Sequence, residues 1–280
     1  MILRAVATTG AVVVALACAS APDTHAAVDR AVSPAVRGLD ISAYQHNGSP
    51  INWQRLAGQG IRFVGIKATE GTYYRNPFYG ADARGAAAAG LTALPYVFAN
   101  PKRDGGRATA KYAVQVTGGT GASGRSPLVV DLENDPYAKA RDCYGRGVTV
   151  MRHWIAGFVT EAHKLTGRLP IIYTTAAWWQ ECTGGSHFSK APLWLAAFGG
   201  TAPDVPSPWS DWALWQYADN GKLPGIGRVD LDYYQPARGL FTLSQPAGHK
   251  KAKKHPATKP KTKRPSTSKH PSKGQRRADS

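Results

Sequence analysis

Apolar, strand-like segments alternate with helix-like segments between about residues 36 and 234. The strand-like segments cover residues 38–44, 63–68, 91–100, 127–134, 169–175, 193–198, 212–217 and 229–234. Of the stretches between them, 77–89, 107–116 and 147–165 predict helices, because apolar residues recur at helical spacings or a glycine follows. The gaps between the last three strands are too short for full helices. The pattern therefore predicts an α/β fold over residues 36–240, an irregular (β/α)8-type barrel with few helices in its last third.

The start of the chain has the layout of a secretory signal peptide. Residues 1–4 are short and positively charged, residues 5–17 form an apolar run, and small residues follow. The run is too short to span a membrane, and no second apolar segment of about 18 residues appears. We expect a signal peptide over residues 1–27, cleaved near Ala26 or Ala27 rather than at the A-x-A sequence that Pro22 follows. The mature protein is then a secreted monomer without a membrane span, extracellular or cell-wall associated.

Removal of the signal peptide leaves two cysteines, Cys143 and Cys182. An even pair in an exported protein favours a disulfide, although two separate thiols remain an alternative. The two cysteines lack the spacing of a zinc site, so we expect no metal and no cofactor.

The net charge of +17 is concentrated at the end of the chain. Residues 250–280 hold twelve Lys or Arg against one acid, Asp279, which makes +11, and the rest of the chain carries only +6. Residues 246–280 are also rich in Lys, Pro and Ser and contain no Leu, Ile, Val, Phe, Tyr or Trp. Such a segment cannot offset the entropy of ordering, so we expect a disordered basic tail.

The segment 127–135 carries the most informative acidic residues. Strand side chains alternate, so Asp131 and Glu133 face one way while Leu128, Val130 and Leu132 face the other. The strand ends of a barrel form its active site, so the two carboxyls should enter the barrel mouth about 6.5 Å apart along the backbone. One charge can then raise the pKa of the other group, as glycoside hydrolysis requires. For an isolated D-x-E, two solvated loop acids would be the more common explanation.

Other strands make a shared acidic pocket the better explanation. Asp40 lies in the first strand, and Asp230 and Asp232 lie in the last, each within an otherwise apolar pattern. A metal site from the same acids lacks the helical His pairs that zinc enzymes use. Aromatic side chains near strand ends suit the apolar faces of sugar rings, although some belong to the core. They are Tyr44, Tyr73, Tyr96, Tyr173, Trp178, Trp179, Trp215 and Tyr217.

Five motifs in order resemble glycoside hydrolase family 25 muramidases. They are residues 38–45 (GLDISAYQ), 67–71 (KATEG), 130–133 (VDLE), 215–217 (WQY) and 229–232 (VDLD). The resemblance spans about residues 36–235, which makes it far more specific than any one motif.

The resemblance implies a lysozyme that cleaves the β-1,4 bond between N-acetylmuramic acid and N-acetylglucosamine of peptidoglycan. Glu133 is implied as the acid/base, with Asp131 supporting the intermediate of a retaining reaction and Asp40 and Asp230 lining the pocket. Attack by the substrate acetamido group and direct attack by Asp131 both remain open. The remaining candidates for substrate binding are Tyr44, Glu70, Tyr96, Tyr173, Trp215 and Tyr217. Two residues depart from the family pattern, Val97 where the family often has His and Phe198 where Tyr is usual, and both positions concern subsite contacts and not proton transfer.

Three other functions stay open. A chitinase is one, although the longer D-x-x-D-x-D-x-E run of one chitinase family is absent. A wall-binding protein without catalysis is another, although all four pocket acids are present. The tail could bind nucleic acid, because a mobile polycation binds any polyphosphate. Export makes anionic cell-wall polymers the expected partners of the tail, and no specific nucleic acid is expected.

Overall fold

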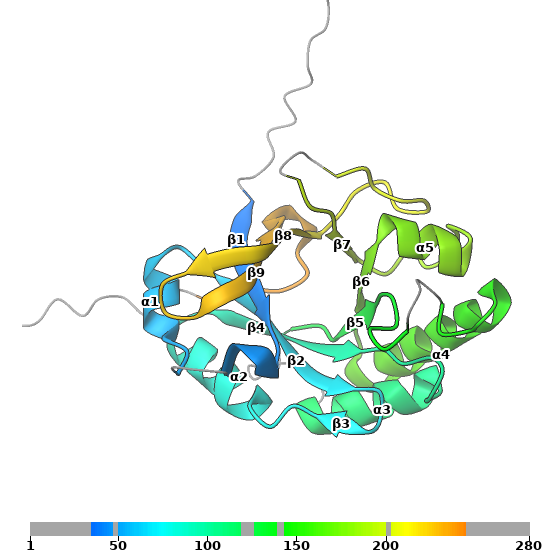
Figure 1. Cartoon of the computed structure of the whole chain (residues 1–280), viewed down its shortest axis with the longest axis horizontal. Coiled ribbons are helices and arrows are strands. Elements are labelled where there is room, and N and C mark those ends of the chain that lie inside the picture. Colours follow the sequence, from blue (N-terminus) through cyan, green and yellow to red (C-terminus); the bar gives the residue numbers. More distant parts are fainter. Residues whose placement is uncertain (1–34, 47–49, 119–125, 139–142, 200–202, 245–280) are drawn as a thin grey trace, which may run out of the picture. The chain divides into compact units, whose positions relative to one another are not determined.

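The strands close into a barrel in the computed structural model, which describes residues 35–46, 50–118, 126–138, 143–199 and 203–244 (Figure 1). The strands are β1 (Val36–Ile41), β2 (Phe63–Glu70), β3 (Tyr74–Arg75), β4 (Thr92–Phe98), β5 (Val129–Leu132), β6 (Ile171–Thr175), β7 (Leu193–Ala196), β8 (Leu214–Leu223) and β9 (Gly227–Tyr234). The helices are α1 (Trp53–Gly58), α2 (Tyr79–Ala88), α3 (Gly106–Thr117), α4 (Val148–Thr166) and α5 (Ala176–Thr183), with short 3-10 turns at Ala43–His46 and Pro236–Arg238. The predicted signal peptide and basic tail lie outside the described residues.

The barrel contains the eight predicted strands, in the order β1-β2-β4-β5-β6-β7-β8-β9 and back to β1. The remaining strand, β3, is a short addition that pairs only with the end of β2. The predicted barrel with few helices in its last third is therefore confirmed.

The last strand runs opposite to the others. β9 is antiparallel to both β8 and β1, whereas the other neighbouring barrel strands pair in parallel. The start of β9 therefore lies at the same rim as the ends of the parallel strands, and Asp230 pairs in register with Asp40. An acid near the beginning of this strand thus reaches the rim at which barrel active sites lie.

Two described helices were not predicted from the sequence, α1 and α5. Each is short, and each has a side-chain cap at its start. Asn52 Oδ1 accepts from Arg55 N at 2.9 Å before α1, and Thr175 Oγ1 accepts from Trp178 N at 3.1 Å before α5. Helices of six and eight residues contain too few turns to show a clear hydrophobic period. The capping residues were therefore the sequence feature that could have predicted them.

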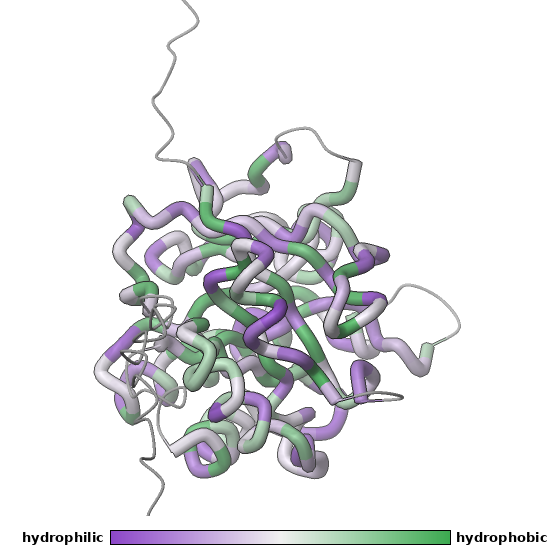
Figure 2. Tube along the Cα trace, turned by 90° about the vertical axis from the view of Figure 1, so that its left-hand side faces the viewer, coloured by the Kyte–Doolittle hydropathy of each residue, from purple (hydrophilic) through white to green (hydrophobic). Residues whose placement is uncertain are grey.

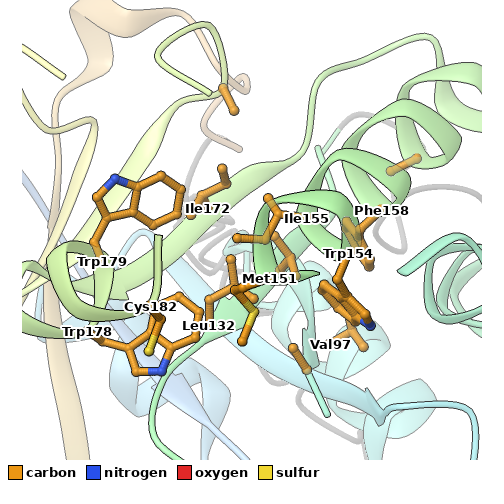
Figure 3. Close-up of a cluster of buried hydrophobic side chains, with 14 of the residues drawn as sticks. Val97, Leu132, Met151, Trp154, Ile155, Phe158, Ile172, Trp178, Trp179 and Cys182 are labelled. Carbon is orange, nitrogen blue, oxygen red and sulfur yellow. The ribbon is translucent and has the colours of Figure 1, made fainter. Parts of the chain in front are cut away.

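Outside the barrel, helices α3, α4 and α5 cover strands β4 to β7. The apolar face of α4, which includes Met151, Ile155 and Phe158, packs in one buried cluster with Val97 of β4 and Leu132 of β5 (Figure 3). Trp178 and Trp179 of α5 belong to the same cluster, so these two aromatics are core residues. Figure 2 shows hydrophobic and hydrophilic residues interspersed along the described trace. The barrel strands β2, β4, β5 and β7 are buried along almost their whole length, because helices or loops cover them outside and side chains fill the interior.

Inside the barrel, large side chains fill the half below the rim. Phe63, Trp194 and Tyr234 are nearly or completely buried there. Two glycines make room for them. A Cβ on Gly38 would lie 2.2 Å from the Phe63 ring, and one on Gly65 would lie 2.6 Å from the Trp194 indole. The glycines on β1 and β2 thus leave space for these rings in the barrel interior. The rings lie beneath the side chains at the rim.

The packed chain continues beyond residue 240, where the barrel was expected to end. Phe241 stacks on Tyr234 with ring centroids 4.1 Å apart, and Ser244 N donates to Thr92 Oγ1 at 3.0 Å. The described segment after β9 therefore closes the end of the barrel opposite the rim of acidic residues.

A disulfide joins Cys143 and Cys182, with the Cα atoms 5.4 Å apart. It ties the segment after β5 to helix α5, as the cysteine pair predicted. None of the described helices is long and apolar enough to cross a membrane.

Candidate active site

A cavity of about 360 Å³ opens at the rim of the barrel where the parallel strands end. Inward side chains of nearly every strand line it: Asp40, Ser42, Tyr44, Lys67, Tyr96, Phe98, Val129, Asp131, Glu133, Tyr173, Trp194, Phe198, Gln216, Asp219 and Asp230. Five of these side chains are carboxyls, and one, Lys67, is a base. The described lining is therefore strongly acidic.

Asp131 and Glu133 enter the cavity from the end of β5. Val129 faces the cavity with them, while Leu128, Val130 and Leu132 belong to the helix-side core cluster. The strand therefore alternates as its sequence predicted. Asp131 is deeper, with 6% of its surface exposed, and Glu133 lies just beyond the strand where more water reaches it.

Burial and neighbouring acids hold protons at this pair. Burial and the nearby Asp40 charge raise the pKa of Glu133 to about 7, against the opposing charge of Lys67. Burial and the Glu133 charge also raise the pKa of Asp131 well above its ordinary value. Two carboxyls this close resist holding two charges in a desolvated site. One proton on the pair is therefore favoured near neutral pH.

Asp40 is held by a chain of hydrogen bonds that crosses the barrel. Tyr173 OH donates to Gln216 Oε1 at 2.9 Å, and Gln216 Nε2 donates to Asp40 Oδ2 at 2.7 Å. Burial raises the pKa of Asp40 to about 6, although the Gln216 hydrogen bond lowers it. The amide thus fixes one carboxylate oxygen of Asp40.

The β8–β9 hairpin adds three more acids. Burial and the Asp40 charge raise the pKa of Asp230 to about 8, with a further contribution from Asp219. Asp232 lies deeper and is fully buried, where Trp194 Nε1 donates to its Oδ1 at 2.9 Å. Burial, followed by the Asp40 charge, raises the pKa of Asp232 well above its ordinary value. The three carboxyls thus extend from the interior below the cavity to its rim, and burial favours the protonated form of Asp230 and Asp232.

The predicted substrate-binding residues divide into three groups. Asp40, Asp230, Tyr44, Tyr96 and Tyr173 line the cavity that holds Asp131 and Glu133. Glu70 lies in an adjoining cavity of about 490 Å³, which shares Ser42, Tyr44 and Lys67 with the first.

Trp215 and Tyr217 line neither of these two cavities. Trp215 Nε1 donates to Ala197 O, and the indole packs against Tyr217 and Tyr233 at centroid distances of 6.0 and 5.8 Å. The prediction that these two aromatics face the pocket is not met, because Gln216 between them is the residue of β8 that points inward.

Eight lining residues were not among the predicted site residues: Ser42, Lys67, Phe98, Val129, Trp194, Phe198, Gln216 and Asp219. Lys67 and Gln216 each carried a usable signal, since each is a polar residue in an otherwise apolar strand. Asp219 carried none, because it is an exposed acid in a hairpin.

The arrangement can donate and accept a proton and stabilise positive charge. A carboxyl that keeps its proton to about pH 7 can act as a general acid, and a carboxylate beside it can stabilise an electron-poor carbon. Among the described residues, no group of three or more His, Cys, Asp or Glu is arranged to hold a metal ion.

Comparison with known proteins agrees with this geometry. Residues 39–226 match the sequence profile of Glycosyl hydrolases family 25. Lysozyme M1 of Streptomyces globisporus is 40% identical over 214 residues, which are 74% of this chain and 71% of that protein. The N,O-diacetylmuramidase of Chalaropsis sp is 37% identical over 191 residues, 66% of this chain and 88% of that protein.

Solved structures share the same barrel. The bacterial lysozyme from Streptomyces coelicolor superimposes with a TM-score of 0.65 at 36% identity, over 74% of this chain and 96% of that chain. A family GH25 lysozyme from Aspergillus fumigatus gives a TM-score of 0.66 at 36% identity, over 74% and 99% of the two chains. On the profile, the sequence relatives and the shared barrel together, this chain belongs to glycosyl hydrolase family 25 and is a glycoside hydrolase.

Proposed function

We propose that the protein is a secreted lysozyme that hydrolyses the β-1,4 bond between N-acetylmuramic acid and N-acetylglucosamine in peptidoglycan. The observation that carries this proposal is the pair of carboxyls at the end of β5, Asp131 and Glu133, which share one desolvated cavity. The names of the relatives, lysozyme and N,O-diacetylmuramidase, support the substrate class.

Glu133 is the proton donor in this proposal. It gives its proton to the glycosidic oxygen while the bond from that oxygen to the anomeric carbon breaks. The raised pKa of Glu133 supports the role, because burial and the neighbouring acids keep one proton on the Asp131–Glu133 pair near neutral pH. In the second half of the reaction, the Glu133 carboxylate takes a proton from the attacking water, so that the acid is restored.

Asp131 stabilises the intermediate of this retaining reaction. In one route the acetamido oxygen of the substrate attacks the anomeric carbon, and the Asp131 carboxylate orients the acetamido group and balances its charge. In the other route Asp131 itself bonds to the carbon. Both routes need Asp131 charged and Glu133 protonated at the first step.

Substrate contacts are assigned to the residues around this pair. Asp40 and Asp230 provide acceptors for sugar hydroxyls, and Tyr44, Tyr96 and Tyr173 provide ring faces and hydroxyls. Glu70 belongs to the adjoining cavity, which shares Ser42, Tyr44 and Lys67 with the first.

Beyond the barrel, we propose that the protein acts as an exported monomer and that its basic tail binds anionic wall polymers. The support is sequence composition alone: an apolar leader at 1–27 and a charge of +11 over residues 250–280, from twelve bases and one acid.

The test compares wild type with Glu133→Gln on purified bacterial walls. The variant should fold and lose lysis by several orders of magnitude, because an amide cannot donate the proton. Glu181→Gln, an exposed acid on α5, is the matched control and should lyse normally. Mass spectrometry should find muramic acid at the reducing end of each product. Near-normal lysis by Glu133→Gln contradicts the assignment of the acid. Reducing-end glucosamine, or equal cleavage of chitin, contradicts the bond specificity.

A further inference from the structure

Lys67 is the one basic side chain among the described residues that line the acidic cavity. It reaches inward from β2, with 15% of its side chain exposed. Its ammonium lies 4.5 Å from the centre of the Phe98 ring and 5.8 Å from that of Tyr74. A long, flexible side chain is thereby confined between two ring faces and the carboxyls.

A bulge in β2 brings an acid onto the same face as Lys67. Residues three apart in a regular strand point to opposite sides of a sheet. The register of β2 against β4 shifts between Lys67 and Thr69, and this extra residue turns Glu70 toward Lys67. Asn76 Nδ2 donates to Lys67 O at 2.7 Å and holds the bulge in place.

A chain of hydrogen bonds then fixes the ammonium. Lys67 Nζ donates to Glu70 Oε2 at 2.8 Å, Tyr73 OH donates to Glu70 Oε1 at 2.6 Å, and Asn100 Nδ2 donates to Tyr73 OH at 3.0 Å. Burial raises the pKa of Glu70, but the hydrogen bonds from Lys67 and Tyr73 outweigh it and lower the pKa overall. Glu70 is therefore negatively charged, and each of its two carboxylate oxygens accepts a hydrogen bond from a protein side chain.

We propose that Lys67 is a positioning residue of the reaction, a counter-ion that keeps the Asp131 carboxylate charged beside Glu133, and that Glu70, Tyr73 and Asn100 hold its ammonium in place. The proposal rests on the roles proposed above for Asp131 and Glu133. It moves Glu70 from direct substrate binding to action through Lys67.

The charges around Lys67 support this role. Asp131 and Glu133, at the end of β5, are the cavity carboxyls that feel the Lys67 charge. The other titratable side chains of the described lining are Asp40, Tyr44, Tyr96, Tyr173, Asp219 and Asp230. Tyr73, Tyr74 and Tyr137 surround Lys67 on the other side. The Lys67 charge opposes the rise in pKa of both Asp131 and Glu133. Without the Lys67 side chain, the described lining of the cavity would contain carboxyls and no positively charged group.

The experiment measures kcat/KM against pH on soluble peptidoglycan glycan fragments for wild type, Lys67→Met, Lys67→Arg and Tyr73→Phe, with the melting temperature of each as a check of folding. Lys67→Met should move the acidic limb of the profile up by about one pH unit, because Asp131 then holds its proton longer. Lys67→Arg keeps the charge and should keep the wild-type limb, whatever its rate. Tyr73→Phe removes the bridging hydroxyl and should shift the limb in the same direction by less.

The outcomes separate this proposal from the one before it. A wild-type acidic limb in a slower Lys67→Met enzyme overturns the counter-ion role. A limb that moves in Lys67→Met but not in Tyr73→Phe overturns the role of the hydrogen-bond chain. Loss of activity in Glu133→Gln beside an unshifted Lys67→Met profile leaves the acid assignment standing and refutes the counter-ion alone.

Discussion

Gln216 Nε2 donates to Asp40 Oδ2 at 2.7 Å across the width of β9, because β9 lies between the strands that carry the two residues. The same amide accepts from Tyr173 OH, so three strands share one hydrogen-bonded unit. A buried donor or acceptor that loses its partner costs roughly 1–3 kcal/mol. The unit is therefore expected to fix the geometry of Asp40 closely.

Gln216→Ala should lower kcat/KM on soluble glycan by roughly 10- to 100-fold, because Asp40 and Tyr173 lose the group that orients them. The pKa of Asp40 should also rise above about 6, since burial then acts without the opposing hydrogen bond. Tyr217→Phe is the control, on the same strand but outside the cavity, and should stay near wild type. Equal effects of the two substitutions would mean that the hydrogen-bonded unit does not act on the reaction.

The buried acid at position 133 should cost stability at alkaline pH. Its pKa is about 7 in the folded protein and 4.5 ordinarily, so its contribution to stability is present below about pH 4.5 and lost as pH rises through 7. Gln carries no charge at either pH. Glu133→Gln should therefore melt at a higher temperature than wild type at pH 8. Its free energy of unfolding there should be higher by on the order of 1–3 kcal/mol, with little difference near pH 4.5. Scanning calorimetry of both proteins, with Glu181→Gln as control, checks this. A difference of the same size at both pH values would disprove it.

Much of the site could be predicted because single charged residues interrupt apolar strands. Asp40 and Asp131 each stand alone in such a pattern, and alternation sends each to the inner face. The direction of β9 could not be predicted in this way. It depends on the turn near Gly225, whose φ is +104, and not on the strand residues themselves. Asp230 was expected in the pocket both as an acid within an apolar strand pattern and by resemblance, and it reaches the rim because β9 runs antiparallel to its neighbours.

Two further features of the site depend on which of two neighbouring strand residues points into the barrel, and composition does not reveal this. In residues 215–217 the aromatic pair draws attention, yet the polar residue between them faces the cavity. In β2 a bulge turns Glu70 to the face of Lys67, against the simple alternation of a strand. Hydropathy patterns carry little information on such shifts, because neighbouring contacts determine where a bulge forms.

Asp131→Asn should reduce kcat by about 1,000-fold or more while leaving glycan binding within roughly 10-fold of wild type. The substitution keeps the shape of the side chain but removes the charge that balances the intermediate. Stopped turnover with retained binding, measured by calorimetry on an unhydrolysed fragment, checks this. Asp219→Asn, at the exposed rim of the same cavity, should be much milder. Turnover that is unchanged in Asp131→Asn would remove this residue from the mechanism.

Loss of the disulfide should lower stability more than activity. Cys143 and Cys182 are separated by 39 residues, and closing such a loop stabilises a fold by roughly 3–4 kcal/mol on the chain-entropy model. Cys182 is 1% exposed, so Cys143→Ala is the milder single change. The double alanine variant should melt at a lower temperature, and its rate on soluble glycan at 25 °C should be nearly normal. Denatured, unreduced mature protein should show no free thiol, and finding two would contradict the bridge.

The basic tail should act as an electrostatic tether and not as part of the active site. Residues 250–280 carry +11, from twelve bases and one acid, and bacterial walls present phosphates and carboxylates at high density. Each exposed charge contributes weakly and is screened by salt, but many together raise the local concentration of enzyme on an insoluble substrate. Deletion of residues 249–280 should leave turnover on small soluble fragments almost unchanged and weaken binding to intact walls at low salt. The difference in wall binding between full-length and truncated enzyme should then shrink as the salt concentration rises. If the tail only improves solubility, both forms should bind walls equally at low ionic strength, and that result would refute the tether hypothesis.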